Sequence, residues 1–187
     1  EIVLAPGADP KSDPCLALRA AVAAAEFGLP IAPGTLQNLK SCPIDDRTWN
    51  DESRSLFLRL LASGPALLQV WEEIDFVDIP GRLIPEWLAI RNRPSASAAH
   101  RYTIDRHSVE VVTRLGRETP RGNRYDDRHY QALLLAGILH DVGKRPGVAD
   151  HAAEGARHAS MVLKRMGFDR DIIWWVTLLV REHLTLS

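Results

Sequence analysis

The sequence is poor in cysteine, in excess charge of either sign and in long apolar runs. Only two of its 187 residues are cysteines, Cys15 and Cys42. Neither has a second Cys or a His at the spacing of a metal finger. We therefore expect two reduced thiols packed between helices, as in a cytosolic protein.

The charges of the chain nearly cancel, with 23 basic and 24 acidic residues and a formal net charge of −1. No overall electrostatic field therefore favours binding to nucleic acid or to an anionic membrane surface. A local basic patch is still compatible with this net charge. No apolar run approaches the roughly 20 residues that span a bilayer. We expect no nucleic-acid partner, no membrane partner and a cytoplasmic location.

The N-terminus has neither an initiator Met nor a basic-then-apolar signal segment. The chain opens on Glu1-Ile2-Val3-Leu4, which we interpret as the start of a piece excised from a longer protein. Its length fits one large domain or two small ones. A hydrophobic share of 45% and a charged share of 25% are those of an ordinary globular chain.

Extended alternating runs are almost absent, and helical apolar spacing is interrupted by Pro and Gly. The sequence therefore predicts an all-α fold, a helical bundle preceded by a helical connector. Asp13-Pro14 is expected to open the first helix, and Ile79-Pro80-Gly81 to form a loop. The helices are expected over 16–27, 33–39, 51–61, 66–74, 127–140, 150–166 and 169–183, with a short element at 86–88. A further helix, capped by Thr103, is expected to carry His107, Val111 and Val112.

A polar stretch rich in small residues, from Arg91 to Ala99, resembles a linker. We place a soft domain boundary there. This divides the chain into a connector region, 1–95, and a second domain, 96–187. A charged loop is expected from Arg117 to Asp126.

The most informative motif follows an apolar helix, where His140-Asp141 is followed by Gly143-Lys144. An imidazole nitrogen beside a carboxylate oxygen can bind one divalent metal. A lysine just beyond can hold a phosphate as a point charge. The motif therefore indicates metal-assisted attack on a phosphate ester.

All seven histidines lie in the second half of the chain. Four occupy helical positions that a bundle can bring to one pocket: His107, His140, His151 and His183. Neutral imidazoles suit Mn²⁺, Fe²⁺, Zn²⁺ or Co²⁺, and the single carboxylate argues against a purely oxygen-ligated Mg²⁺ site. His129 and His158 are expected to be ordinary surface or packing residues, and His100 to support the site by hydrogen bonds.

The order His107…His140-Asp141 resembles the opening of the HD-domain phosphohydrolase signature. Five short sequence segments resemble the HD region of the bifunctional PII uridylyltransferase/uridylyl-removing enzymes. They are 84–87, 100–107, 140–144, 150–151 and 180–184. The segment upstream resembles the connector that links the nucleotidyltransferase and HD domains of that family.

The resemblance implies a phosphodiesterase that removes UMP or AMP from a tyrosine of the PII signal protein. It implies up to two divalent ions, Mn²⁺, Mg²⁺, Fe²⁺ or Zn²⁺. His107, His140 and Asp141 would hold the first ion, and His151 and His183 the second. Lys144 would neutralise charge on the transition state, and Asp150 would orient His151 or act as a base.

The sequence departs from the family pattern at its end, because no aspartate follows His183 before Ser187. A closing Asp ligand is therefore expected outside this chain, as are the nucleotidyltransferase and glutamine-sensing domains. Two rival functions stay open. One is a nucleotide phosphohydrolase of the same fold acting on small molecules, and the other is a non-catalytic helical interaction module.

Overall fold

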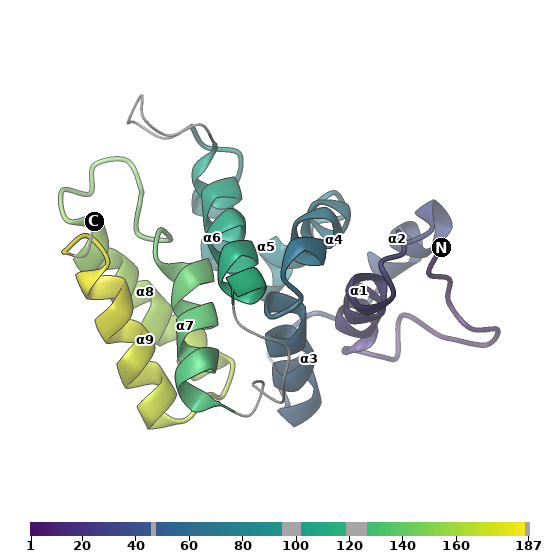
Figure 1. Ribbon diagram of the computed structural model, residues 1–187. Coiled ribbons are helices and arrows are strands. Elements are labelled where there is room, and N and C mark those ends of the chain that lie inside the picture. Colours follow the sequence, from purple (N-terminus) through teal and green to yellow (C-terminus); the bar gives the residue numbers. More distant parts are fainter. Residues whose placement is uncertain (46–47, 95–101, 119–126, 186–187) are drawn as a thin grey trace.

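The computed structural model describes residues 1–45, 48–94, 102–118 and 127–185, and over them it confirms the all-α prediction (Figure 1). In these residues the only extended pairings are isolated bridges at Ile2–Ile31 and Pro94–Thr103. The helices are α1 (Leu16–Phe27), α2 (Pro33–Leu39), α3 (Asp51–Leu61), α4 (Pro65–Asp75), α5 (Ile79–Leu83), η2 (Pro85–Ala89), α6 (Ile104–Glu118), α7 (Arg128–Leu139), α8 (His151–Arg165) and α9 (Arg170–Glu182).

Four helices begin where a capping side chain precedes them. The side chains of Asp127, Asp150 and Asp169 accept backbone N–H bonds at the starts of α7, α8 and α9. Asn50 and Ser53 form a reciprocal capping box on α3. These caps satisfy N–H groups that have no partner within the helix, so they fix where the site-bearing helices begin.

Two local predictions were wrong. Ile79–Leu83 is helical rather than a loop, because Pro80 is tolerated in a first turn and Ile79 and Leu83 are buried. Asp13 does not cap α1, which begins at Leu16 after Cys15. Its carboxylate instead accepts the Cys15 N–H within the preceding turn.

The helices share one hydrophobic core that extends from α1 to α9. Figure 1 shows α7, α8 and α9 grouped beside the C-terminus, with α6 between them and α4. An ion pair between Glu86 of η2 and Arg165 of α8 joins residues from the two sides of the predicted boundary. The boundary itself, within 95–101, falls outside the described residues. No described helix combines the length and apolar character needed to cross a membrane.

Candidate metal centre

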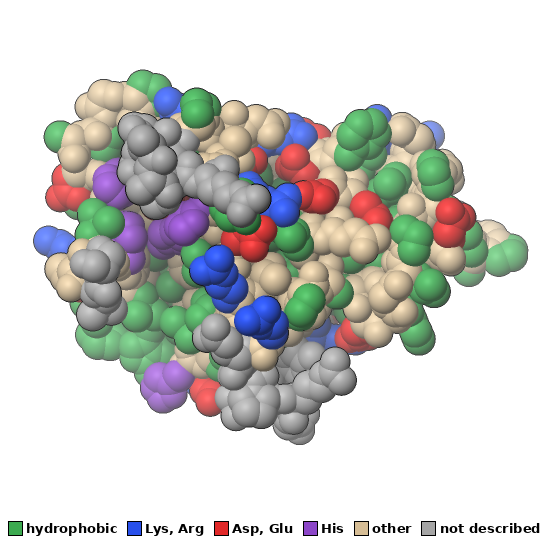
Figure 2. Space-filling view, turned by 45° about the horizontal axis from the view of Figure 1, so that its top comes forward, with side chains coloured by type: hydrophobic (Ala, Val, Ile, Leu, Met, Phe, Trp, Pro, Cys, Tyr) green, Lys and Arg blue, Asp and Glu red, His purple; other side chains and the backbone are tan. Residues whose placement is uncertain are grey.

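The ends of three helices and the first turn of a fourth meet at one point of the fold. His140 directly follows α7, His151 begins α8 and His183 directly follows α9, while His107 lies one turn into α6. Figure 2 shows histidine side chains gathered on one face of the molecule. The structure thus brings together all four histidines that the sequence selected.

These histidines form two potential ligand groups that share one carboxylate. The first is His107, His140 and Asp141, and the second is Asp141, His151 and His183. Within each group the ligand atoms lie within 4.8 Å of one another. Oδ2 of Asp141 is 3.4 Å from Nε2 of His140, and Oδ1 is 3.7 Å from Nε2 of His183. The two carboxylate oxygens therefore face different groups, which is the arrangement of a bridging ligand.

Backbone carbonyls orient two of the imidazole rings. Nδ1 of His140 is 2.8 Å from the carbonyl oxygen of Gly137, and Nδ1 of His183 is 2.6 Å from that of Val180. A carbonyl can only accept, so Nδ1–H donates in both cases. This selects the tautomer that leaves a lone pair on Nε2, the form in which a neutral imidazole binds a metal.

The donor set fits a divalent cation. Asp141 is 1% exposed. Oδ1 of Asp141 and Nε2 of His151 and His183 are buried and have no hydrogen-bond partner among the described residues. Buried polar atoms are almost always paired, and leaving them unpaired is costly. A cation held between them would remove that cost, and imidazole with carboxylate is a common ligand set for Mn²⁺, Fe²⁺ and Zn²⁺.

The electrostatics also favour the metal-binding protonation states. Burial alone would raise the pKa of the Asp141 carboxyl. Contacts with His140 and Lys144 outweigh burial and hold that pKa well below its ordinary value. Burial and the nearby Lys144 ammonium lower the pKa of His151. An ionised carboxylate and a neutral imidazole are the forms that ligate metals.

A close approach of two glycines brings the turn after α7 against the start of α8. A Cβ added at Gly143 would lie 2.2 Å from the carbonyl oxygen of His151 and 2.3 Å from the nitrogen of Gly155. Both neighbours are backbone atoms, which cannot swing away. Only glycine fits at position 143, and this contact places Asp141 beside His151.

The two predicted catalytic residues occupy different surroundings. Nζ of Lys144 lies 2.8 Å from Oδ2 of Asp141, at the edge of the cluster. Asp150 is exposed, and its Oδ1 accepts the backbone N–H of Ala153 at the start of α8. Among the described residues no hydrogen bond joins Asp150 to His151. A role for Asp150 beyond capping stays a prediction.

The other histidines that the structure describes, His129 and His158, do not join the cluster. His129 is exposed and stacks on Trp175, with ring centroids 4.5 Å apart. His158 is buried, and its Nε2 lies 2.9 Å from Oε1 of Glu154. His100 falls outside the described residues, so its expected supporting role is untested.

Sequence reasoning did not anticipate the shared carboxylate or the orienting carbonyls of Gly137 and Val180. Only the adjacency of His140 and Asp141 hinted at sharing. The carbonyls follow from helix geometry, because each lies three residues before its histidine at a helix end.

Comparison with known proteins shows which family and which enzymes this chain resembles in sequence. A family model described as "HD domain" matches residues 104–186. Over its whole length the chain is 40% identical to part of the bifunctional uridylyltransferase/uridylyl-removing enzyme of Streptomyces coelicolor and covers 22% of that protein. The corresponding values for the enzyme of Mycobacterium tuberculosis are 39% and 22%. For that of Corynebacterium glutamicum the identity is 33%, over 94% of this chain and 25% of the relative. The chain thus spans about a fifth of the length of the first two relatives.

Proposed function

Because residues 104–186 belong to the HD-domain family, we propose that this chain carries the metal-dependent hydrolase centre of a larger enzyme. The bond cleaved is a phosphodiester, and the groups that hold the metal are His107, His140, Asp141, His151 and His183. The observation that carries the proposal is the sharing of Asp141 by two histidine groups whose inward-facing atoms are buried without partners.

The roles of the residues follow from their positions. His107 and His140 would hold one divalent cation, and His151 and His183 a second, with Asp141 contacting both. When bound, such cations supply Lewis acidity, which lowers the pKa of water toward neutrality and withdraws charge from phosphoryl oxygens.

Lys144 is placed to compensate negative charge on the substrate. Its ammonium is partly exposed and lies at the edge of the cluster, against Oδ2 of Asp141. A phosphate entering the site would share this cation with the carboxylate, and charge that grows on the phosphoryl oxygens would strengthen the contact. Asp150, on the exposed start of α8, would orient His151 or act as a base at the rim of the site.

The substrate class comes from the relatives. Their names describe enzymes that add and remove uridylyl groups. We extend the removal activity to this chain, with UMP or AMP released from a tyrosine of the PII signal protein, as the family resemblance implies. Nucleotidyltransferase and glutamine-sensing domains would then lie elsewhere in the longer protein.

The test uses the full-length protein, with Mn²⁺ and uridylylated or adenylylated PII, and measures nucleotide release. We expect release by the unaltered enzyme and loss of release by at least 100-fold in His140→Ala. His129→Ala serves as a matched control, because that histidine is exposed and outside the cluster, and it should retain full activity.

Two results would overturn the proposal, each in favour of a named rival. Hydrolysis of free nucleotides without release from PII would favour a small-molecule phosphohydrolase. Absence of both hydrolysis and bound metal would favour a non-catalytic helical module.

A further inference from the structure

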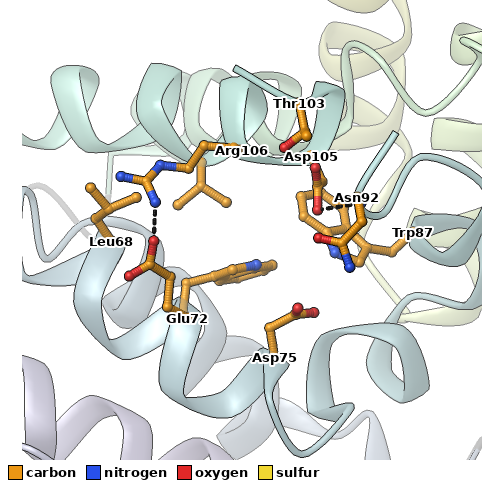
Figure 3. Close-up of a pocket in the computed structure, with 10 residues that line it drawn as sticks. Leu68, Glu72, Asp75, Trp87, Asn92, Thr103, Asp105 and Arg106 are labelled. Atoms are coloured by element: carbon orange, nitrogen blue, oxygen red, sulfur yellow. Dashed lines mark hydrogen bonds and ion pairs between the residues drawn. The ribbon is translucent and has the colours of Figure 1, made fainter. Parts of the chain in front are cut away.

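Apart from the metal centre, a polar pocket lies between α6, α4 and η2. It is a cavity of about 200 Å³. Figure 3 shows Asp75 approaching it from α4, Asp105 and Arg106 from α6, and Trp87 from η2. We call it the indole pocket. Its lining residues include Leu68, Trp71, Glu72, Asp75, Trp87, Asp105 and Arg106.

Four polar atoms of the indole pocket lack hydrogen-bond partners among the described residues. Two are donors, Nε1–H of Trp71 and of Trp87, and two are acceptors, Oδ1 of Asp75 and of Asp105. Trp87 is 1% exposed, Trp71 4% and Asp105 8%. Buried tryptophan N–H groups usually find an acceptor. Four such atoms around one cavity therefore suit a molecule that both accepts and donates hydrogen bonds.

The charges around the indole pocket leave one carboxylate without a cation. Arg106 is engaged by Glu72 and Glu110, and Nε of Arg91 lies 3.0 Å from Oδ2 of Asp75. Among the described residues, Oδ2 of Asp105 accepts a hydrogen bond from the backbone N–H of Asn92 alone, at 2.9 Å. No ion pair links Asp105 to a basic side chain within the described ranges.

The negative potential extends to Asp75. Burial raises the pKa of its carboxyl group above the ordinary value. Arg91 opposes the rise, while the charges of Asp105 and Asp78 add to it. Although Arg91 pairs with Asp75, Oδ1 of Asp75 has no hydrogen-bond partner among the described residues and offers a positive group a second carboxylate oxygen.

We propose that the indole pocket binds a small organic ammonium compound that also carries a hydroxyl group. The ammonium group would donate to the free carboxylate oxygens of Asp75 and Asp105. The hydroxyl oxygen would accept from an indole N–H, and the indole rings would add cation–π attraction. The volume, equal to roughly seven water molecules, limits the ligand to a small molecule.

The experiment follows the indole N–H resonances by NMR during titration with three molecules of nearly the same size. These are 3-aminopropanol, neutral 1,3-propanediol and anionic 3-hydroxypropionate. Trp71→Phe and Trp87→Phe assign the two resonances. We expect 3-aminopropanol to shift both in a saturable way, with an affinity at least ten-fold above that of the diol, and 3-hydroxypropionate to shift neither.

Variants separate the pocket from general effects. Asp105→Asn keeps an oxygen that can accept from Asn92 but removes the charge, so binding should weaken at least ten-fold. Asp171→Asn, on the exposed start of α9, is the matched control and should bind normally. Leu68→Phe adds volume at the cavity wall and should also weaken binding.

Equal responses to all three molecules, or no response to 3-aminopropanol, would overturn the proposal and indicate a cavity filled by water. Binding that Asp105→Asn leaves unchanged would overturn it as well. His140→Ala should bind 3-aminopropanol normally, so the outcome does not depend on the metal centre.

Discussion

Nζ of Lys144 lies 2.8 Å from Oδ2 of Asp141, the carboxylate shared by both histidine groups. The lysine therefore neutralises a nearly inaccessible negative charge while remaining partly exposed itself. A divalent cation at Asp141 would compete with this ammonium group. Lys144 is thus both a stabilising partner of the metal-free site and a candidate contact for substrate phosphate.

Replacing Lys144 by Met should destabilise the metal-free protein by about 1–3 kcal/mol, because a buried charged acceptor loses a partner. The same change should enlarge the rise in melting temperature caused by Mn²⁺, since the competitor is gone and ligand binding stabilises the folded state. Thermal unfolding with and without Mn²⁺ measures both effects.

Lys164→Met provides the control, because Lys164 is exposed on α8 and outside the cluster. It should change neither quantity noticeably. A Mn²⁺ response that Lys144→Met leaves unchanged would show that the ammonium and the metal do not compete.

Gly143→Ala should separate the turn after α7 from the start of α8. The added Cβ would meet backbone atoms of His151 and Gly155 at 2.2 and 2.3 Å, so the chain must shift. We expect a loss of about 1–3 kcal/mol from overpacking and weaker metal binding at His151, measured by denaturant unfolding and Mn²⁺ titration.

Gly34→Ala is the matched control, since its Cβ would meet nothing within 4 Å. It should leave stability nearly unchanged. If Gly143→Ala were equally neutral, the close approach would not be what positions His151.

The Glu86–Arg165 ion pair predicts a pH-dependent contribution to stability. The Glu86 side chain is 10% exposed and is bound by both terminal nitrogens of Arg165. Burial alone would raise the pKa of Glu86. The hydrogen bonds and charge of Arg165, with a smaller effect of His158, lower it below the ordinary 4.5.

A carboxyl group with a lowered folded-state pKa stabilises the protein fully above its unfolded-state pKa. This stability is lost as the pH falls through the folded-state value. Glu86→Gln should therefore cost about 1–3 kcal/mol at pH 7, and its difference from the unaltered protein should shrink at pH values below 4.5. Urea unfolding across this range measures the difference.

Glu26→Gln is the comparison, because the Glu26–Arg59 pair is half exposed on both sides. Such surface pairs contribute about 0–1 kcal/mol. An equally small effect of Glu86→Gln at pH 7 would contradict the structural role of this partly buried pair.

Local signals made much of the fold predictable. Asp127, Asp150 and Asp169 precede helices because their side chains satisfy free N–H groups, and that chemistry is visible in the sequence. Ile79–Leu83 was missed because Pro80-Gly81 is also a turn signal, and burial of Ile79 and Leu83 decided the outcome. Tertiary packing, which the sequence does not display, overrode the local preference.

The candidate site was predictable in its members but not in its geometry. His107, His140, His151 and His183 were selected as candidate ligands, and the structure brings them together. The close approach of Gly143 to Gly155, which packs the turn after Asp141 against the start of α8, is a tertiary contact that the local sequence does not reveal. The indole pocket depends on contacts between α4, η2 and α6, over a sequence separation that local patterns cannot reveal.

The proposed bridging role of Asp141 is tested most directly by counting the Mn²⁺ ions bound per chain in equilibrium dialysis. We predict two ions for the unaltered protein, one each for His107→Ala and His151→Ala, and none for Asp141→Ala, with folding checked by circular dichroism. Retention of two ions by folded Asp141→Ala, or no Mn²⁺ bound by the unaltered protein, would contradict the shared metal centre.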